Sequence, residues 1–263
     1  MERKTIRRTV TVSGTNVWRR ERAALTLAPA LPDSGIVING IPAVTRYAWS
    51  FEHSTCLRRG RVHIKMIEHL LAACAGLGIT DVAVTLDSDE LPLLDGSSLP
   101  FVRAIRRAGM TDSGVAARPL VLIRPVMVEG PRGFAAAVPA AHVRLTALID
   151  PPAVPEPQVF SSPITPAVFA RAIAPARTFG PSPDSPAETR RALGLPFALR
   201  RWNGLLFPAR PRLPQEPCRH KLLDLLGDLA LLGRPLCAEV FAFRPGHRQN
   251  LALARAIERE MEN

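Results

Sequence analysis

Two stretches of the chain share the same order of apolar and polar positions. In HLLAACAGLG (69–78) and DLLGDLALLG (224–233), paired leucines, small residues and a final glycine fall at matching positions. This pattern predicts two amphipathic helices, each ended by its glycine. A strand-like stretch follows each helix, at 81–87 and 237–243. The spacing between the two units is too long for a solenoid repeat and indicates a duplicated domain.

The remaining pattern predicts strands and helices in both halves of the chain. Alternating residues predict strands at 5–12, 23–28, 34–38 and 118–130. Helices are expected over 65–77, at the end of 90–110, and over 167–174, 187–193, 219–228 and 251–262. Six prolines predict a loop over 151–166. Strands that alternate with helices in both halves indicate two α/β layers packed together.

A histidine and an aspartate lie one turn apart in the second of the two predicted repeat helices. His220 and Asp224 occupy positions i and i+4 of RHKLLDLLGD (219–228), so both side chains project from one helix face. Leucines flank them, and ionisable groups are not buried without partners. A divalent metal ion is a common partner for such a pair. Asp228 continues the same stripe by one further turn.

The repeat adds a second histidine to this candidate site. In the register that aligns the leucine pairs, His69 falls on Asp224. If the two units face each other, His69, His220 and Asp224 converge on one metal ion. The alternative is a set of separate surface groups on two amphipathic helices. The recurrence of polar residues at one position of both units favours the metal site.

Length and composition restrict the class of protein. A chain of 263 residues, 47% of them hydrophobic, suits one large domain or two smaller ones. No apolar run reaches the roughly 18 residues of a membrane span. The N-terminal MERKTIRRTVTV lacks the apolar centre of a signal peptide, so we expect a cytoplasmic location. The four cysteines form no CxxC pair, which argues against a disulfide framework.

The net charge of +11 leaves three kinds of partner to consider. These are nucleic acid, an anionic membrane surface and a phosphate-bearing substrate. With one tyrosine and no ribonucleoprotein or zinc-finger pattern, the chain is not expected to bind nucleic acid. Peripheral contact with an anionic membrane and binding of a phosphate-bearing substrate both stay open.

Four further residues carry chemistry beside the predicted metal site. Glu68 precedes His69, and an acid next to a ligand can reach a water without binding the metal. His247 lies in a glycine-containing turn after the second strand, and Lys221 follows His220 directly. Thr178 lies in ARTFG (176–180), between two apolar stretches.

With these residues in place, the chain resembles the bacterial UDP-3-O-acyl-N-acetylglucosamine deacetylases, the zinc enzymes of lipid A synthesis. The resemblance extends over nearly the whole chain. The matching pieces are TVSG (11–14), DSGIV (33–37), IEHLLAACAGLGI (67–79), LPLLDGSSLPFV (91–102), ARTFG (176–180), RHKLLDLLGDLALLGRPL (219–236) and the GH at 246–247.

The resemblance implies a fold, a metal and a substrate. The implied α+β fold has two duplicated two-layer α/β domains, here 1–117 and 118–263, forming a sandwich with helices packed between the sheets. The implied cofactor is Zn²⁺, with Fe²⁺ as the alternative. The implied reaction is removal of the N-acetyl group from a UDP-linked acylated amino sugar by a zinc-activated water. We expect the chain to act as a monomer.

The resemblance also implies a role for each candidate residue. The family's metal ligands match His69, His220 and Asp224, the set that the repeat predicts. Its acid–base pair matches Glu68 and His247. Its remaining site positions assign an oxyanion contact to Thr178, substrate binding to Lys221 and orientation of His247 to Asp228.

Two segments differ from the family pattern. SGTNVWRRE (13–21) stands where the family reads SGVGLHSG, so a histidine and glycines are replaced. In FALRRWNGLLF (197–207), Leu199, Arg200 and Arg201 replace small residues near the family's acyl-chain passage. We therefore expect a narrowed passage and a preference for short or absent 3-O-acyl groups.

Two functions are alternatives to the one that the resemblance implies. A divergent paralogue would deacetylate another N-acyl substrate with the same catalytic residues. A non-catalytic binding protein could retain the fold alone. The presence of both Glu68 and His247 argues against the second, because a binding protein needs no acid–base pair.

Overall fold

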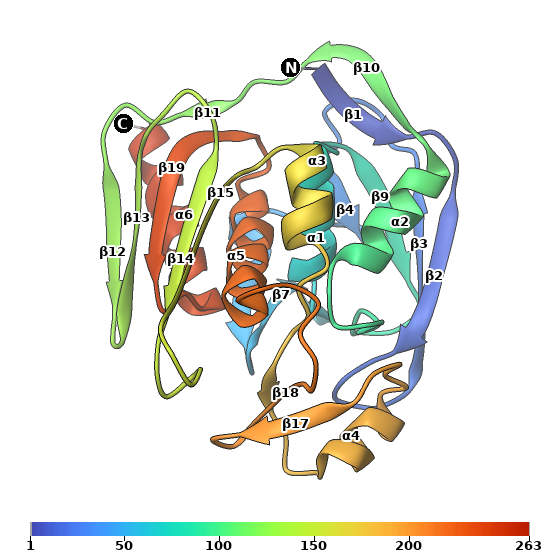
Figure 1. Ribbon diagram of the computed structural model, residues 1–263. Helices are drawn as coiled ribbons and strands as arrows, with labels where there is room; N and C mark the ends of the chain where they lie inside the picture. Colours follow the sequence, from blue (N-terminus) through green and yellow to red (C-terminus); the bar gives the residue numbers. More distant parts are fainter. Residues whose placement is uncertain (1, 263) are drawn as a thin grey trace.

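Alternating burial along β3 (Arg22–Ala28) shows how the sequence forms a two-layer unit. Ala23, Leu25 and Leu27 are buried while the residues between them are not. One face of the strand therefore packs against helices and the other faces outward. The computed structural model, which describes residues 2–262, repeats this arrangement in two sheets with helices between them (Figure 1).

The two large sheets have the same strand order. The first is β2-β3-β9-β4-β5 and the second is β12-β13-β19-β14-β15. In each sheet the central strand, β9 or β19, is antiparallel to one neighbour and parallel to the other. The predicted duplication and the predicted α+β sandwich are therefore confirmed.

The bounds of the main elements follow the chain through both units. The first sheet contains β2 (Val10–Thr15), β3, β9 (Val82–Leu86), β4 (Ile36–Ile38) and β5 (Ile41–Pro42). The second contains β12 (Val126–Gly130), β13 (Gly133–Pro139), β19 (Leu236–Phe243), β14 (Arg144–Ile149) and β15 (Gln158–Pro163), with β11 (Leu120–Val121) beside β19. The helices between the sheets are α1 (Glu68–Leu77), α2 (Leu99–Ala108), α5 (Glu216–Leu229) and α6 (His247–Glu262).

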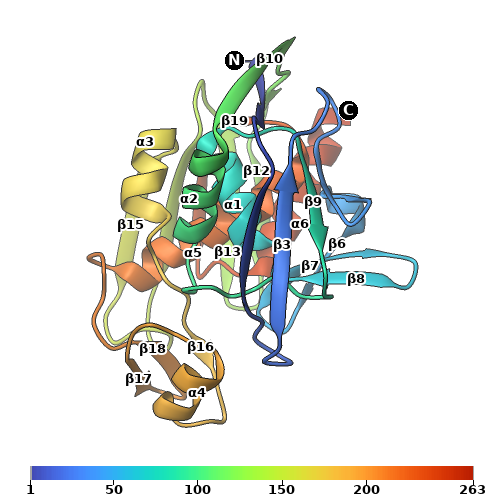
Figure 2. The same cartoon turned by 90° about the vertical axis from the view of Figure 1, so that its right-hand side faces the viewer.

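Smaller elements lie at the edges of this sandwich. β1 (Glu2–Ile6) pairs with β10 (Met110–Ala116). A three-stranded sheet of β6 (Ala48–Phe51), β7 (Ser54–Arg59) and β8 (Val62–Lys65) extends from the first unit. A second small sheet of β16 (Gly180–Pro181), β18 (Leu205–Pro208) and β17 (Leu199–Trp202) carries α4 (Pro186–Ala192). This insert lies below the sandwich, and the short helix α3 (Pro166–Val168) precedes it (Figures 1 and 2).

Helices α1 and α5 pack against each other at the centre of the molecule. Leu70, Leu71 and Leu225 are fully buried there. A glycine makes the close approach possible, because a Cβ at Gly227 would overlap the carbonyl oxygen of Glu68. The crossing therefore brings the start of α1 against the last turn of α5.

Several sequence predictions differ from the structure in their bounds, and the predicted strand at 118–130, for example, forms two strands, β11 and β12. The strand pattern at 5–12 is divided between β1 and β2, which belong to different sheets. The proline-rich segment 151–166 is not all loop, because β15 forms within it as an edge strand, where missing N–H donors are tolerated. The last helix begins at His247 and not at 251, so His247 lies on the first turn of α6.

Two further predictions concern organisation. The predicted boundary at 117/118 falls between β10 and β11 and stays a prediction. Within the described residues, no helix combines the length and the apolar character required to cross a membrane.

Candidate active site

The crossing of α1 and α5 brings the three predicted metal ligands together. Nε2 of His220 lies 3.3 Å from Oδ1 of Asp224, and Nε2 of His69 lies 3.8 Å from the same oxygen. One potential ligand atom from each residue lies within 4.8 Å of the others, and all three side chains are buried. The two imidazole rings meet edge to face at 5.1 Å. The convergence predicted from the repeat is present.

The charge states of these groups suit a cation. Burial, and then the charge of His220, lower the pKa of His69 to about 3, and burial also lowers the pKa of His220. Burial opposes ionisation of Asp224, but His220 and Lys221 hold its pKa well below the usual range. Two neutral imidazoles and a carboxylate are a donor set that Zn²⁺ and Fe²⁺ both accept.

The hydrogen bonds around the three residues leave the right atoms free for an ion. His220 Nδ1 lies 3.0 Å from the carbonyl oxygen of Ala176, which directs Nε2 toward Asp224. Lys221 donates to Asp224 Oδ2 at 2.8 Å. Among the described residues no donor reaches the buried Oδ1 of Asp224. The Nε2 lone pair of His220 and the unpartnered Oδ1 of Asp224 face each other, which fits a divalent ion between them.

Glu68 lies at the first turn of α1 with its carboxylate buried beside the three candidate ligands. The backbone N–H of Thr55 donates to its Oε2 at 3.0 Å. Burial raises the pKa of Glu68 to about 7, with Asp224 and Asp228 adding to the shift and His247 opposing it. A carboxylate with this pKa can accept and release a proton near neutral pH.

His247 approaches the cluster from a third helix. Its Nε2 lies 3.9 Å from Asp224 Oδ2, while its Nδ1 lies 2.9 Å from Asp228 Oδ2. Burial alone would lower the pKa of His247, but the charge of Asp228 and the hydrogen bond to it, together with Glu68, raise it to about 9. Asn250 also donates to Asp228 Oδ2 at 2.8 Å. His247 is therefore held as a cation near neutral pH, and its Nε2 faces the cluster.

Thr178 and Lys221 lie on the side of the site where the small insert begins. The N–H of Thr178 donates to the carbonyl oxygen of Gly96 at 2.7 Å, which ties its loop to the loop before α2. The ammonium of Lys221 lies 5.4 Å above the ring of Phe179 and is paired with Asp224. The roles assigned to these two residues stay predictions.

A buried ion pair supports the loop that carries Thr178. Arg177 binds Glu216, at the start of α5, through Nε at 2.7 Å and Nη2 at 3.0 Å. The N–H of Arg212 donates to the same carboxylate. The pair joins the 176–180 loop to α5, so that the Ala176 carbonyl oxygen and His220 are held in contact.

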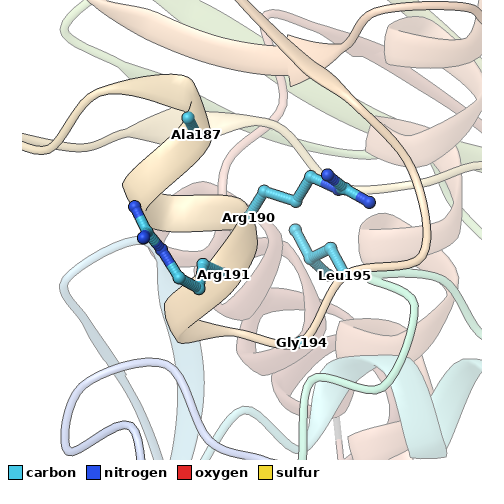
Figure 3. Close-up of a pocket in the computed structure, with 5 residues that line it drawn as sticks. All are labelled: Ala187, Arg190, Arg191, Gly194 and Leu195. Atoms are coloured by element: carbon cyan, nitrogen blue, oxygen red, sulfur yellow. The ribbon is translucent and has the colours of Figure 1, made fainter.

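A surface hollow at α4 is not part of this site. Its volume is about 500 Å³, and it is lined by Ala187, Arg190, Arg191, Gly194 and Leu195. Figure 3 shows the guanidinium groups of the two arginines pointing apart. None of the predicted site residues lines it, so the buried cluster is the candidate active site.

The structure adds residues that the sequence did not indicate. Thr55 and Asn250 both contact Asp228, and Ser98 donates to the carbonyl oxygen of His69 at 2.7 Å. Asn250 lies one turn after His247, a spacing that a helix predicted from His247 onward would have revealed. For Thr55 no periodicity signals its position, because it comes from a strand outside both repeats. The thiol of Cys218 donates to the carbonyl oxygen of Ala147 and is not in the cluster.

Comparisons with known proteins cover nearly the whole chain. A family model described as UDP-3-O-acyl N-acetylglycosamine deacetylase matches residues 3–259. The chain is 34% identical to the UDP-3-O-acyl-N-acetylglucosamine deacetylase of Myxococcus xanthus (strain DK1622), over 97% of this chain and 85% of the relative. It is 37% identical to the protein of the same name in Solibacter usitatus (strain Ellin6076), over 96% and 90%. It is 34% identical to the protein of the same name in Chlamydia felis (strain Fe/C-56), over 98% of this chain and 98% of the relative. The chain therefore belongs to the UDP-3-O-acyl N-acetylglycosamine deacetylase family.

Proposed function

We propose that this chain is a metal-dependent amide hydrolase that removes the N-acetyl group from UDP-3-O-acyl-N-acetylglucosamine in lipid A biosynthesis. One observation carries the proposal in a chain of this family. The buried His69–His220–Asp224 cluster has a carboxylate, Glu68, and a cationic imidazole, His247, beside it. Amide hydrolysis requires a base for the water and an acid for the leaving amine, and we assign these roles to Glu68 and His247.

The cluster would hold the ion through Nε2 of His69, Nε2 of His220 and Oδ1 of Asp224. When bound there, Zn²⁺ would lower the pKa of a water from about 15.7 to about 7 and so supply a nucleophile near neutral pH. Three protein ligands leave a position open, as a catalytic site requires. Fe²⁺ would suit the same ligands.

Glu68 serves as the general base in this proposal. Its carboxylate takes a proton from the attacking water while the water oxygen bonds to the acetyl carbonyl carbon. The raised pKa of Glu68 matches this task, because the group is a stronger base than an exposed glutamate. Thr178 is proposed to contact the oxyanion that forms, and Lys221 to bind polar groups of the substrate.

His247 serves as the general acid. It donates a proton from Nε2 to the leaving nitrogen as the carbon–nitrogen bond breaks, which yields acetate and a free amine. Asp228 accepts a hydrogen bond at Nδ1, so the ring keeps the orientation that directs Nε2 to the site. The same carboxylate stabilises the imidazolium before transfer.

A deacetylase assay tests the proposal. Purified, zinc-loaded protein is incubated with UDP-N-acetylglucosamine carrying or lacking a 3-O-acyl chain, and the free amine is measured. We expect amine from at least one of the two, and loss of turnover in Glu68→Ala. If neither compound is deacetylated while the protein retains its metal, the proposed substrate is wrong and another N-acyl compound becomes the candidate.

The proposal includes a cytoplasmic, monomeric protein that binds no nucleic acid. The basic charge suits the diphosphate of the substrate, and peripheral contact with an anionic membrane is a further expectation from it. Light scattering during gel filtration would test the monomer, and vesicle sedimentation would test the membrane contact.

A further inference from the structure

Thr55 connects three residues of the proposed acid–base machinery. It lies on β7, in the small sheet beside the first unit, and is fully buried. Its backbone N–H donates to Glu68 on α1 at 3.0 Å. Its hydroxyl donates to Asp228 Oδ1 on α5 at 2.5 Å and lies 3.0 Å from His247 Nδ1 on α6. One residue thus contacts the base, the acid and the carboxylate that orients the acid.

The geometry determines which atom of this cluster carries each hydrogen. Thr55 has a single hydroxyl proton, and the carboxylate of Asp228 is its nearer partner. The lone pairs of the hydroxyl are then left for His247 Nδ1. That nitrogen must carry a proton, which points between Thr55 Oγ1 at 3.0 Å and Asp228 Oδ2 at 2.9 Å. The arrangement admits one orientation of the ring and aims Nε2 at the site.

We propose that Thr55 is a positioning residue, whose hydroxyl holds the Asp228–His247 pair while its backbone N–H holds Glu68. This inference rests on the proposed function. Without the hydroxyl, Asp228 Oδ1 would lose its donor in a buried place, and a buried carboxylate oxygen without a partner does not keep its position. The contact with Glu68 would remain, since it comes from the backbone. Loss of the hydroxyl should therefore disturb the positions of Asp228 and His247 and leave that of Glu68 unchanged.

Substitutions at Thr55 separate the effect of its hydroxyl on kcat from the effect of its side-chain shape. Thr55→Val keeps the shape and suits a strand, while Thr55→Ser keeps the hydroxyl. We expect Thr55→Val to lower kcat by roughly 10- to 100-fold, the loss of one hydrogen bond to a charged group, with KM and metal content unchanged. Thr55→Ser should restore kcat to within about threefold of wild type. If Thr55→Val does not fold, Thr55→Ala and Thr55→Ser give the same comparison, because they differ only by the hydroxyl.

A matched control tests whether any buried threonine behaves in this way. Thr45 is also buried, and its hydroxyl also donates to a carboxylate, that of Glu258 near the far end of α6. Thr45→Val should leave kcat within about twofold of wild type. If Thr45→Val and Thr55→Val lower kcat equally, or if Thr55→Ala equals Thr55→Ser, the positioning role is overturned.

A double-mutant cycle tests the coupling to His247 itself. If Thr55 acts through His247, adding Thr55→Val to His247→Ala should change kcat by less than about twofold. An undiminished loss in that background would contradict the proposal.

A measurement without turnover separates this inference from the proposed reaction. In metal-free protein with nitrogen-15 histidine, the Nδ1–H of His247 should give a slowly exchanging signal, assigned through its loss in His247→Gln. It should vanish in Thr55→Val and persist in Thr55→Ser and Thr45→Val. This holds even if no substrate is turned over, so failure of the reaction and failure of the Thr55 role are distinct results. A signal unchanged in Thr55→Val would refute the role.

Discussion

The imidazole of His220 is neutral, and because its Nδ1–H is directed to a backbone carbonyl oxygen, its Nε2 has no hydrogen to offer Asp224. Burial lowers the pKa of both His220 and His69. The Nε2 lone pair of His220 faces the buried Oδ1 of Asp224, and Nε2 of His69 lies 3.8 Å from the same oxygen. Such a cluster is unfavourable without a cation and strongly favourable with one.

Metal content provides the first prediction at the level of single residues. Purified protein should contain about one divalent ion per chain, and His69→Ala should lose most of it because three ligands become two. Elemental analysis after gel filtration measures the ratio. His63→Ala, on β8, serves as the control and should keep the metal. Stoichiometric metal in a His220→Ala, Asp224→Ala double variant would show that the ion binds elsewhere.

The pH dependence of turnover provides the second prediction. Glu68 must be deprotonated to act as a base, so kcat/KM should rise as pH rises through its pKa, about 7. His247 must be protonated to act as an acid, so kcat/KM should fall as pH rises through its pKa, about 9. A bound cation lowers both values, so in loaded protein each limb should lie at or below these points.

Single substitutions test which residue produces each limb of the pH profile of kcat/KM. Glu68→Ala and His247→Ala should each lower turnover by about 10²–10⁴-fold and keep the metal. His247→Ala should also lose the alkaline limb of the profile. An alkaline limb that persists in His247→Ala would mean that another group supplies the proton.

The sequence reveals residues of this site only where a regular spacing links them. His220 and Asp224 follow from one helical turn, and His69 follows from the register of the repeat. Glu68, Thr178, Lys221 and His247 gain their roles from resemblance. Thr55 could not be predicted, because Asp228 and His247, the two partners of its hydroxyl, lie 173 and 192 residues away in the chain.

At the level of elements, the contact between α1 and α5 depends on the absence of a side chain at Gly227. The two helices of the repeat were predicted to within a few residues, because their leucine spacing is strong. β13 was not predicted, since its GFAAAVP is rich in alanine and has low strand propensity. It forms because β12 pairs with its residues 133–137 and β19 with its residues 134–139.

Substitution of Gly227 tests the helix contact. Gly227→Ala places a methyl group against the backbone of Glu68, which cannot move without shifting α1. We expect a loss of about 2 kcal/mol or more in the free energy of unfolding, together with weaker metal binding. Gly130→Ala on β12 is the control, since a Cβ there meets only ordinary contacts, and it should change stability by less than about 0.5 kcal/mol. Equal stability of the two variants would contradict the close packing.

At the scale of the whole molecule, the small insert of β16, β17, β18 and α4 follows the 176–180 loop, which contacts His220 of the site. Phe179 stacks on Phe207 at 4.8 Å, and Arg200 lies 5.7 Å above the Phe207 ring. The cavity beside them has a volume of about 30 Å³. Arg201 is turned to the insert itself, where it donates to the carbonyl oxygen of Ser182. The two aromatic rings and the exposed Arg200 thus line a small cavity at the edge of the insert.

Acyl-chain length tests the consequence for substrate choice. Burying methylenes against Arg200 would require its guanidinium to lose water, which is costly. We therefore expect kcat/KM to be higher for short or absent 3-O-acyl groups than for long ones, and Arg200→Ala to improve the long chains. A rate that rises steadily to a 14-carbon chain in the wild type would contradict the narrowed passage.

The candidate ligands come from both units of the duplicated fold, His69 from the first and His220 and Asp224 from the second. An ion held between them would therefore cross-link the two repeated units. At a free concentration 1,000 times the Kd, such an ion adds about 4 kcal/mol to stability. Removal of the ion by a chelator should then speed amide hydrogen exchange first in α1 and α5. The exchange rates in the β1–β10 pair should not change. A duplicated protein would in this way use its reaction centre to keep its two halves together.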